Sequence, residues 1–174
     1  MDTSKLILSC KEFKVFKGKI QYNDEIREDY YIERKAGVNI FPIDNNGNLI
    51  LIEEYRSFVG KTILKTPGGG IEKDEEPIEA AKRELEEETS YTASLNNFKE
   101  IELFEFKGWI RYKIYFFVVS NVKISKETII KDTSEQIKVL KIPVDKALEF
   151  ILNTKSSFDP LLLYGITKLR KLMG

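Results

Sequence analysis

A glycine-rich loop that runs into an acidic helix is the feature that most constrains this chain. The loop is Pro67-Gly-Gly-Gly70, and we expect a helix over Pro77–Thr89. Pro77 suits the first turn of a helix, where its missing N–H leaves no hydrogen bond unmade. Three apolar residues repeat at helical spacing and should face the core: Ile78, Ala81 and Leu85. The segment therefore predicts a loop followed by an amphipathic helix.

The charge of the chain is concentrated in this segment. The chain has 28 basic and 28 acidic residues, yet nine acidic and only three basic residues fall between Glu72 and Glu88. The segment therefore carries −6 and the remainder +6. A solvated acidic helix face is the ordinary interpretation of such a run.

Projected at about 100° per residue, the charged side chains of the helix separate into two groups. One group forms two i,i+4 pairs, Glu79–Arg83 and Lys82–Glu86, typical of a surface. The other group lies on a different arc and consists of Glu84, Glu87 and Glu88. Stacked carboxylates repel one another unless a cation lies between them. All-oxygen ligands favour Mg²⁺ or Mn²⁺, so a metal site and a solvated surface both remain open on spacing alone.

Composition excludes several kinds of chemistry. The chain has no histidine and one cysteine, Cys10, so a Ser-His-Asp triad, a His-containing zinc site and an internal disulfide are excluded. Acid–base or metal chemistry must come mainly from carboxylates. Zero net charge argues against bulk electrostatic binding of nucleic acid. The longest apolar run, Ile114–Val119, is too short to span a bilayer, and the N-terminus lacks the features of a signal peptide. We expect a cytoplasmic protein without nucleic-acid or membrane partners.

Strands and helices alternate in a mixed order along the chain. Short strands are expected over residues 5–10, 12–16 and 19–22, with Gly18 as a turn. The clearest hairpin signal joins Gly37–Ile43 to Leu49–Ile52 through an Asp-Asn-Asn-Gly-Asn turn. Strands near residues 101–106, 112–119 and 137–142 follow the acidic helix, and two helices, from about Pro143 and after Asp159, close the chain. This order predicts an α/β fold with helices packed on a mixed sheet.

The loop and helix resemble a known family motif. Seven residues stand at the spacing of the Nudix box, G-x(5)-E-x(7)-R-E-U-x-E-E-x-G-U, where U is bulky and apolar: Gly69, Glu75, Arg83, Glu84, Leu85, Glu87 and Glu88. Ser90 replaces the last glycine and Tyr91 the last apolar residue. Ser90 should adopt the left-handed conformation that glycine favours, at a cost of about 1 kcal/mol.

Further segments resemble the ADP-ribose/nucleoside-diphosphate-sugar pyrophosphatase branch of the Nudix hydrolases. Glu54-Tyr55-Arg56 matches its Gln-Tyr/Phe-Arg motif, with Glu54 in place of glutamine. Lys65-Thr-Pro-Gly-Gly69 matches Glu-Leu-Pro-Ala-Gly, with Lys65 in place of an acid. The resemblance implies one domain over residues 1–174. It has a Nudix-type α/β/α sandwich with a mixed sheet at 36–174 and an antiparallel β extension at 1–35 that forms a homodimer.

The resemblance also implies a mechanism: Mg²⁺-dependent attack of water on a pyrophosphate bond, with Mn²⁺ as a possible substitute. Its implied metal ligands are Gly68 (through its carbonyl), Glu84, Glu87, Glu88 and Glu135; Glu87 and Glu135 are also the candidate catalytic residues. Asp132 is the alternative to Glu135. Implied structural residues are Gly69, Glu75 and Arg83, and implied substrate contacts are Arg56 and Trp109, with Tyr30 and Tyr31 as weaker candidates for stacking on adenine across a dimer.

ADP-ribose, split into AMP and ribose 5-phosphate, is the expected substrate within this branch. Another nucleotide sugar such as GDP-mannose remains open, because the loops that select the sugar cannot be positioned from sequence. A non-catalytic sensor of nucleotide sugars is the alternative from a different class. It is weakened because such proteins usually lose the glutamates that are retained here.

Overall fold

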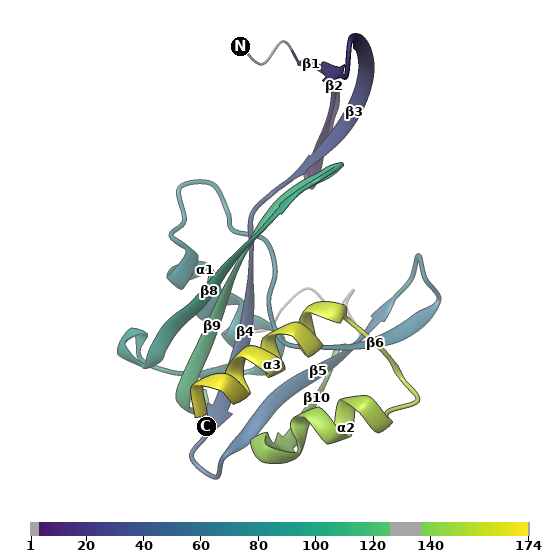
Figure 1. Cartoon of the computed structure of the whole chain (residues 1–174). Helices are drawn as coiled ribbons and strands as arrows, with labels where there is room; N and C mark the ends of the chain where they lie inside the picture. Colours follow the sequence, from purple (N-terminus) through teal and green to yellow (C-terminus); the bar gives the residue numbers. More distant parts are fainter. Residues whose placement is uncertain (1–3, 126–136, 174) are drawn as a thin grey trace.

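The computed structural model of the chain describes residues 4–125 and 137–173 (Figure 1). Its strands are β1 (Lys5–Ser9), β2 (Phe13–Tyr22), β3 (Glu25–Arg34), β4 (Gly37–Asp44), β5 (Asn48–Arg56), β6 (Lys61–Lys65), β7 (Tyr91–Thr92), β8 (Phe98–Lys107), β9 (Ile110–Ile124), β10 (Ile137–Pro143) and β11 (Ser157–Phe158). Its α-helices are α1 (Pro77–Thr89), α2 (Ala147–Asn153) and α3 (Pro160–Met173), and short 3₁₀ turns are Leu95–Asn97 and Val144–Lys146.

The strands form a mixed sheet, as the order of elements predicts. The main path is β1-β2-β3-β9-β4-β5-β6-β11, with β8 and β7 paired to β9 and β10 paired to β5. Strand β9 pairs in parallel with β3 and β4 and antiparallel with β8. The mixed α/β sheet predicted from the sequence is confirmed.

Of the predicted hairpin between β4 and β5, the turn is confirmed, but the strands do not pair along their length. The two strands are paired at a single position, Ile43 with Leu49. Beyond that point β4 pairs with β9, and β5 pairs with β6 and β10. The turn is closed by the Asp44 carboxylate, which accepts hydrogen bonds from the backbone N–H groups of Asn46 and Asn48, each at 2.9 Å. Pairing between neighbours in sequence therefore gives way to pairing with distant strands that complete the core.

The helices cover both faces of the sheet (Figure 1). Alternating residues along β4 and β5 belong to different apolar clusters: Ile40 and Ile50 pack with α1, whereas Phe41 and Leu51 pack with α2 and α3. Because side chains of a strand alternate between faces, this division places α1 opposite the other two helices. Two apolar layers thus sandwich the central strands.

The first three strands form an antiparallel extension that projects away from this sandwich (Figure 1). The prediction of a turn at Gly18 is wrong, because Gly18 lies within β2 and pairs with Asp29 of β3. The reversal comes at Asn23 instead, a residue with φ of 53°, a backbone conformation that asparagine adopts more readily than most residues. One continuous strand, β2, therefore replaces the two short strands expected at residues 12–16 and 19–22, and it pairs along its length with β3.

Helix α1 has the bounds predicted from the sequence, and it ends at Ser90 in the left-handed conformation, with φ of 59°. The Ser90 N–H donates a 3.0 Å hydrogen bond to the Glu86 carbonyl and so closes the last turn. In the described ranges 4–125 and 137–173, no helix combines the length and apolar character needed to cross a bilayer.

Candidate active site

The glycine-rich loop passes between β4 and α1, too close to either for a side chain. Backbone hydrogen bonds of 2.9 Å attach it to β4, from Ile40 N to Pro67 O and from Val38 N to Gly69 O. A Cβ atom at Gly68, whose φ is 151°, would collide with the Val38 carbonyl oxygen, and one at Gly69 would collide with the Glu84 carboxylate. Gly68 therefore has to be glycine, whereas a side chain at Gly69 would displace the Glu84 carboxylate, and the loop brings backbone atoms against the acidic face of α1.

Glu84 and Glu88 lie one turn apart on α1 and face the loop. Each is only 8% exposed, and both line a cleft of about 820 Å³ together with Gly68 and Gly69. Burial raises the pKa of Glu88, and the Glu84 charge adds to this, while the Lys65 ammonium and the Gly68 N–H act in the opposite direction. Glu87, the third member of the predicted group, is absent from the cleft lining and contacts Arg83 instead.

Arg83 joins the loop to the helix. Its guanidinium donates to both oxygens of Glu75, at 2.8 and 3.0 Å, and to the Gly70 carbonyl at 3.0 Å. A third nitrogen, Nη1, donates to Glu84 at 2.7 Å and to Glu87 at 2.9 Å. The hydrogen bonds from Arg83 lower the pKa of Glu75. We call Arg83 with Glu75, Glu84 and Glu87 the outer cluster.

This geometry corrects one predicted pair. The i,i+4 contact between Lys82 and Glu86 forms, at 3.9 Å, but Arg83 turns away from Glu79 toward Glu75 and the loop. A planar guanidinium gains two parallel hydrogen bonds from one carboxylate there, which a solvated i,i+4 contact would not supply.

Lys65 contributes a second cation on the other side of the acidic face. Its Nζ atom lies 2.9 Å from Glu54 Oε2, 3.2 Å from Glu88 Oε1 and 3.3 Å from the Gly68 carbonyl oxygen. Burial opposes the charge on Lys65, but the carboxylates of Glu88 and Glu54 raise its pKa above the ordinary value. We call Lys65, Glu54, Glu88 and Arg56 the inner cluster, since Arg56 Nε lies 2.9 Å from Glu54 Oε1.

Sequence reasoning singled out Arg56 and Glu88 in this inner cluster but gave no role to Lys65 or Glu54. The departures from the family pattern at these two positions were a signal that could have found them. Glu54 lies on β5 and Lys65 on the adjacent strand β6, and their opposite charges form an ion pair.

The rest of the cleft is rich in basic side chains. Besides Lys65, its lining includes Lys11, Arg34, Lys35 and Arg56. These come from the N-terminal extension and from the ends of β3 and β5, segments that sequence reasoning did not bring together except for Arg56. The cleft therefore combines an acidic wall with a group of cations.

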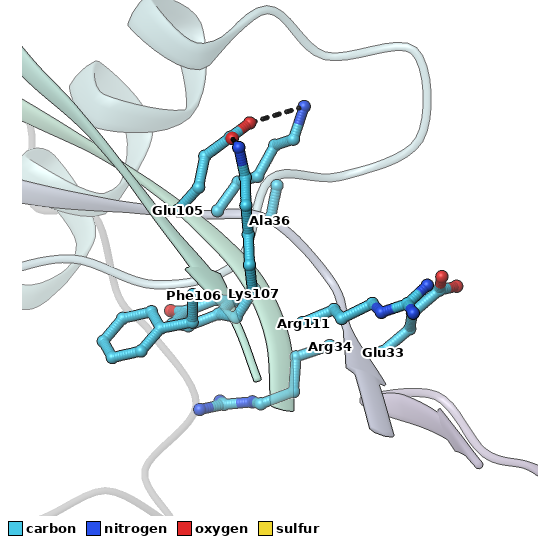
Figure 2. Close-up of a pocket in the computed structure, with 9 residues that line it drawn as sticks. Glu33, Arg34, Ala36, Glu105, Phe106, Lys107 and Arg111 are labelled. Carbon is cyan, nitrogen blue, oxygen red and sulfur yellow. Dashed lines mark ion pairs between the residues drawn. The ribbon is translucent and has the colours of Figure 1, made fainter. Parts of the chain in front are cut away.

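A second hollow of about 560 Å³ adjoins the cleft, because Arg34 and Tyr112 line both. The Arg34 guanidinium lies over the Tyr112 ring, 4.6 Å from its centroid. Figure 2 shows Arg34 and Phe106 extending to one side of this hollow, while Glu105 forms ion pairs on the other. Two aromatic side chains, Phe106 and Tyr112, and several charged ones thus share its lining.

The remaining predicted residues lie apart from the cleft or outside the described residues. Trp109 occupies the exposed turn between β8 and β9 and lines neither hollow, so its substrate contact stays a prediction. Tyr31 lies under Arg111, with the guanidinium 3.7 Å from the ring centroid, and Tyr30 is exposed. Glu135 and its alternative Asp132 fall outside the described residues.

The donors in the cleft fit a hard divalent cation, but only as a partial set. Glu84, Glu88 and the Gly68 carbonyl supply oxygen atoms, the ligand type that Mg²⁺ and Mn²⁺ prefer. Within the part of the chain that the structure describes, no three acidic, cysteine or histidine side chains converge closely enough to bind a metal ion by themselves. Further oxygen donors would have to come from substrate, water or another segment.

Comparisons with known proteins agree with this architecture. The family model of the NUDIX domain matches residues 33–161. An ADP-ribose pyrophosphatase of Bacillus subtilis (strain 168) is 27% identical over 139 residues, which cover 80% of this chain and 74% of the relative. A methanol dehydrogenase activator of Bacillus methanolicus is 26% identical over 129 residues, covering 74% of this chain and 69% of the relative.

A solved structure shares the fold over nearly the whole chain. It is described as the crystal structure of an ADP compounds hydrolase, and it superposes with a TM-score of 0.83 at 20% sequence identity. The alignment covers 99% of this chain and 93% of the other, so the N-terminal extension belongs to the shared fold.

Proposed function

The chain belongs to the NUDIX domain family and is a Nudix hydrolase, and from this premise we propose that it hydrolyses ADP-ribose to AMP and ribose 5-phosphate with Mg²⁺ or Mn²⁺. One observation carries the proposal: buried Glu84 and Glu88 line the same cleft as a group of basic side chains. A diphosphate bound to a divalent ion presents both signs of charge and matches both groups.

In the proposed reaction a water oxygen bonds to one phosphorus while the bridging P–O bond breaks, and two monophosphates leave. The bound ion would neutralise phosphate charge and orient the attacking water. Glu84, Glu88 and the Gly68 carbonyl would hold it, with Glu87 acting indirectly through Arg83. Arg56 and its basic neighbours would bind the phosphate oxygens. Glu135 remains the proposed base and further ligand, and Asp132 its alternative.

The hollow beside the cleft supports a nucleoside attached to that diphosphate. Phe106 and Tyr112 offer aromatic surface, and Arg34 stands where the hollow meets the cleft. Aromatic rings and a guanidinium suit a purine ring and its adjoining phosphate. The name of the Bacillus subtilis relative supports ADP-ribose over other nucleotide sugars.

The N-terminal extension supports the proposed homodimer. Its strands expose several large apolar side chains, each about half exposed or more, namely Leu6, Ile7, Leu8 and Ile26. Several exposed apolar side chains on one extension are a feature that an interaction surface would use. Sedimentation equilibrium of the purified chain tests the assembly, and a monomer at micromolar concentration would contradict it. A cytoplasmic location is part of the same proposal.

A phosphate-release assay with a panel of nucleotide sugars tests the function. We expect turnover of ADP-ribose with Mg²⁺, and AMP and ribose 5-phosphate as products. Glu88→Gln should lower kcat/KM by about 10³-fold because it removes a charged oxygen donor. Glu86→Gln is the matched control on the opposite face of α1 and should retain activity. Faster turnover of GDP-mannose than of ADP-ribose would make GDP-mannose the substrate. Binding of a nucleotide sugar without turnover would indicate a sensor.

A further inference from the structure

We propose that Lys65 is a built-in cation of the active site, which does the work of one divalent ion between Glu54, Glu88 and the Gly68 carbonyl. The inference rests on the proposed metal-dependent function. It adds a positioning residue to that function: Lys65 fixes two of the proposed metal-binding groups and reduces the number of divalent ions that the cleft takes up.

The contacts of Lys65 are those of a bound cation. Its three N–H groups have three oxygen partners, at 2.9 Å on Glu54, 3.2 Å on Glu88 and 3.3 Å on Gly68. Two of these partners, Glu88 and the Gly68 carbonyl, belong to the donor set proposed for the metal. An ammonium group here therefore shares ligands with the divalent ion rather than facing solvent.

The inner cluster is electrically complete without any added ion. Glu54 and Glu88 contribute two negative charges, and Lys65 and Arg56 contribute two positive charges. The side chains of Glu54 and Glu88 are only 4% and 5% exposed, so water neutralises little of their charge. With Lys65 uncharged or absent, two buried carboxylates and a carbonyl oxygen would surround a space that favours a divalent cation.

Lys65 differs from the other cation on the acidic helix in its position: it lines the cleft, whereas Arg83 contacts Glu84 from outside the cleft lining. Arg83 also contacts several carboxylates, but its planar guanidinium spans from Glu75 to Glu87 along the outside of α1. A compact ammonium group on a flexible stem can take the central position among three oxygen atoms, as a metal ion does.

Mn²⁺ titration monitored by electron paramagnetic resonance tests the proposal, because only unbound Mn²⁺ gives the sharp signal. We expect Lys65→Met to bind about one more Mn²⁺ per chain than the unmodified protein. Lys65→Gln should do the same, and it serves if the methionine variant folds poorly. Lys65→Arg should match the unmodified protein, since it keeps the charge. Lys138→Met is the matched control, because Lys138 pairs with Glu53 on the surface.

Thermal unfolding supplies a second readout. Saturating Mn²⁺ should raise the melting temperature of Lys65→Met by about 5 °C more than that of the unmodified protein. Unchanged or weaker Mn²⁺ binding in both neutral variants would overturn the proposal. Failure of the proposed function is separate, since it would appear as no ADP-ribose turnover by the unmodified protein. Even then, a gain of Mn²⁺ in the variants would support the role of Lys65, and no gain would refute it.

Discussion

The outer and inner clusters each neutralise carboxylates of α1 with a cation, but the two cations differ in how far they are buried. The outer cluster gathers Glu75, Glu84 and Glu87 around Arg83, whose side chain is 29% exposed. The inner cluster gathers Glu54 and Glu88 around Lys65, whose side chain is 11% exposed. Both cations keep the acidic helix stable, but only the inner one lies among the groups that line the cleft.

The comparison shows that the burial of a cation and its partners determines how far solvent can replace that cation. Solvent can replace part of what Arg83 provides, because Arg83 itself and two of its three carboxylate partners, Glu75 and Glu87, are partly exposed, although Glu84 is buried. Little solvent reaches the partners of Lys65, so its removal leaves buried charges that need another cation. Substitutions that exchange or remove these two cations should therefore have unequal effects, which the following measurements compare.

The largest expected effect is that of Lys65→Met on stability without metal. Breaking a buried ion pair by removing one partner costs about 3–5 kcal/mol, and Lys65 has two carboxylate partners. Urea denaturation in the presence of a chelator gives the free energy of unfolding. Lys138→Met should change it by less than about 0.5 kcal/mol. Similar costs for these two variants would mean that the inner cluster contributes no more than a surface pair.

Arg83→Met should cost less, about 2 kcal/mol, although Arg83 makes more hydrogen bonds than Lys65. The reason is that solvent reaches Arg83 and two of its three carboxylate partners, Glu75 and Glu87. The same denaturation experiment measures it, with Arg83→Lys as a companion that keeps the charge but loses the bidentate contact. A cost equal to that of Lys65→Met would remove the distinction between the clusters.

Acid should weaken the outer cluster through protonation of Glu75. Arg83 lowers the pKa of Glu75 below 4.5 in the folded chain. The ionised carboxylate therefore stabilises the fold above pH 4.5, and this contribution is lost as pH falls through the folded-state pKa. Glu75→Gln should flatten the decline of unfolding free energy between about pH 5 and pH 3. The change should stay below about 1 kcal/mol because solvent screens part of the interaction.

The smallest effect should come from the residue that ends the helix shared by both clusters. Ser90 holds a left-handed conformation that glycine adopts without strain. Ser90→Gly should therefore raise the free energy of unfolding by about 0.5–1 kcal/mol. ADP-ribose turnover should be unchanged, and a loss of turnover would show that the helix end also positions the carboxylates.

The outer cluster could be predicted in part from the sequence, and the inner one could not. Arg83 and Glu87 are one turn apart on a helix whose bounds follow from Pro77 and the apolar spacing, so their contact depends on local geometry. Lys65 meets Glu54 and Glu88 across 11 and 23 residues of chain. Those contacts depend on how β5, β6 and α1 are placed, which local spacing does not determine.

The same distinction holds for the sheet. The turn between β4 and β5 could be predicted because Asp44 and its neighbours close it locally. The partner of β4 could not, since β9 begins more than sixty residues later and is chosen by packing on both faces. Gly18 misled the prediction because glycine also occurs within strands.

Trp109 gives the chain an optical property that follows from its position. It is the single tryptophan, it is 84% exposed at the turn between β8 and β9, and its carbonyl accepts a 2.7 Å hydrogen bond from Ile32 N. Its fluorescence in an isolated chain should resemble that of indole in water and be quenched readily by iodide. Unfolding of the core should change that emission little, whereas any chain or ligand that covers the turn should shift it to shorter wavelength. The indole therefore reports association at the turn between β8 and β9, beside β3, independently of the sandwich that carries the glutamates.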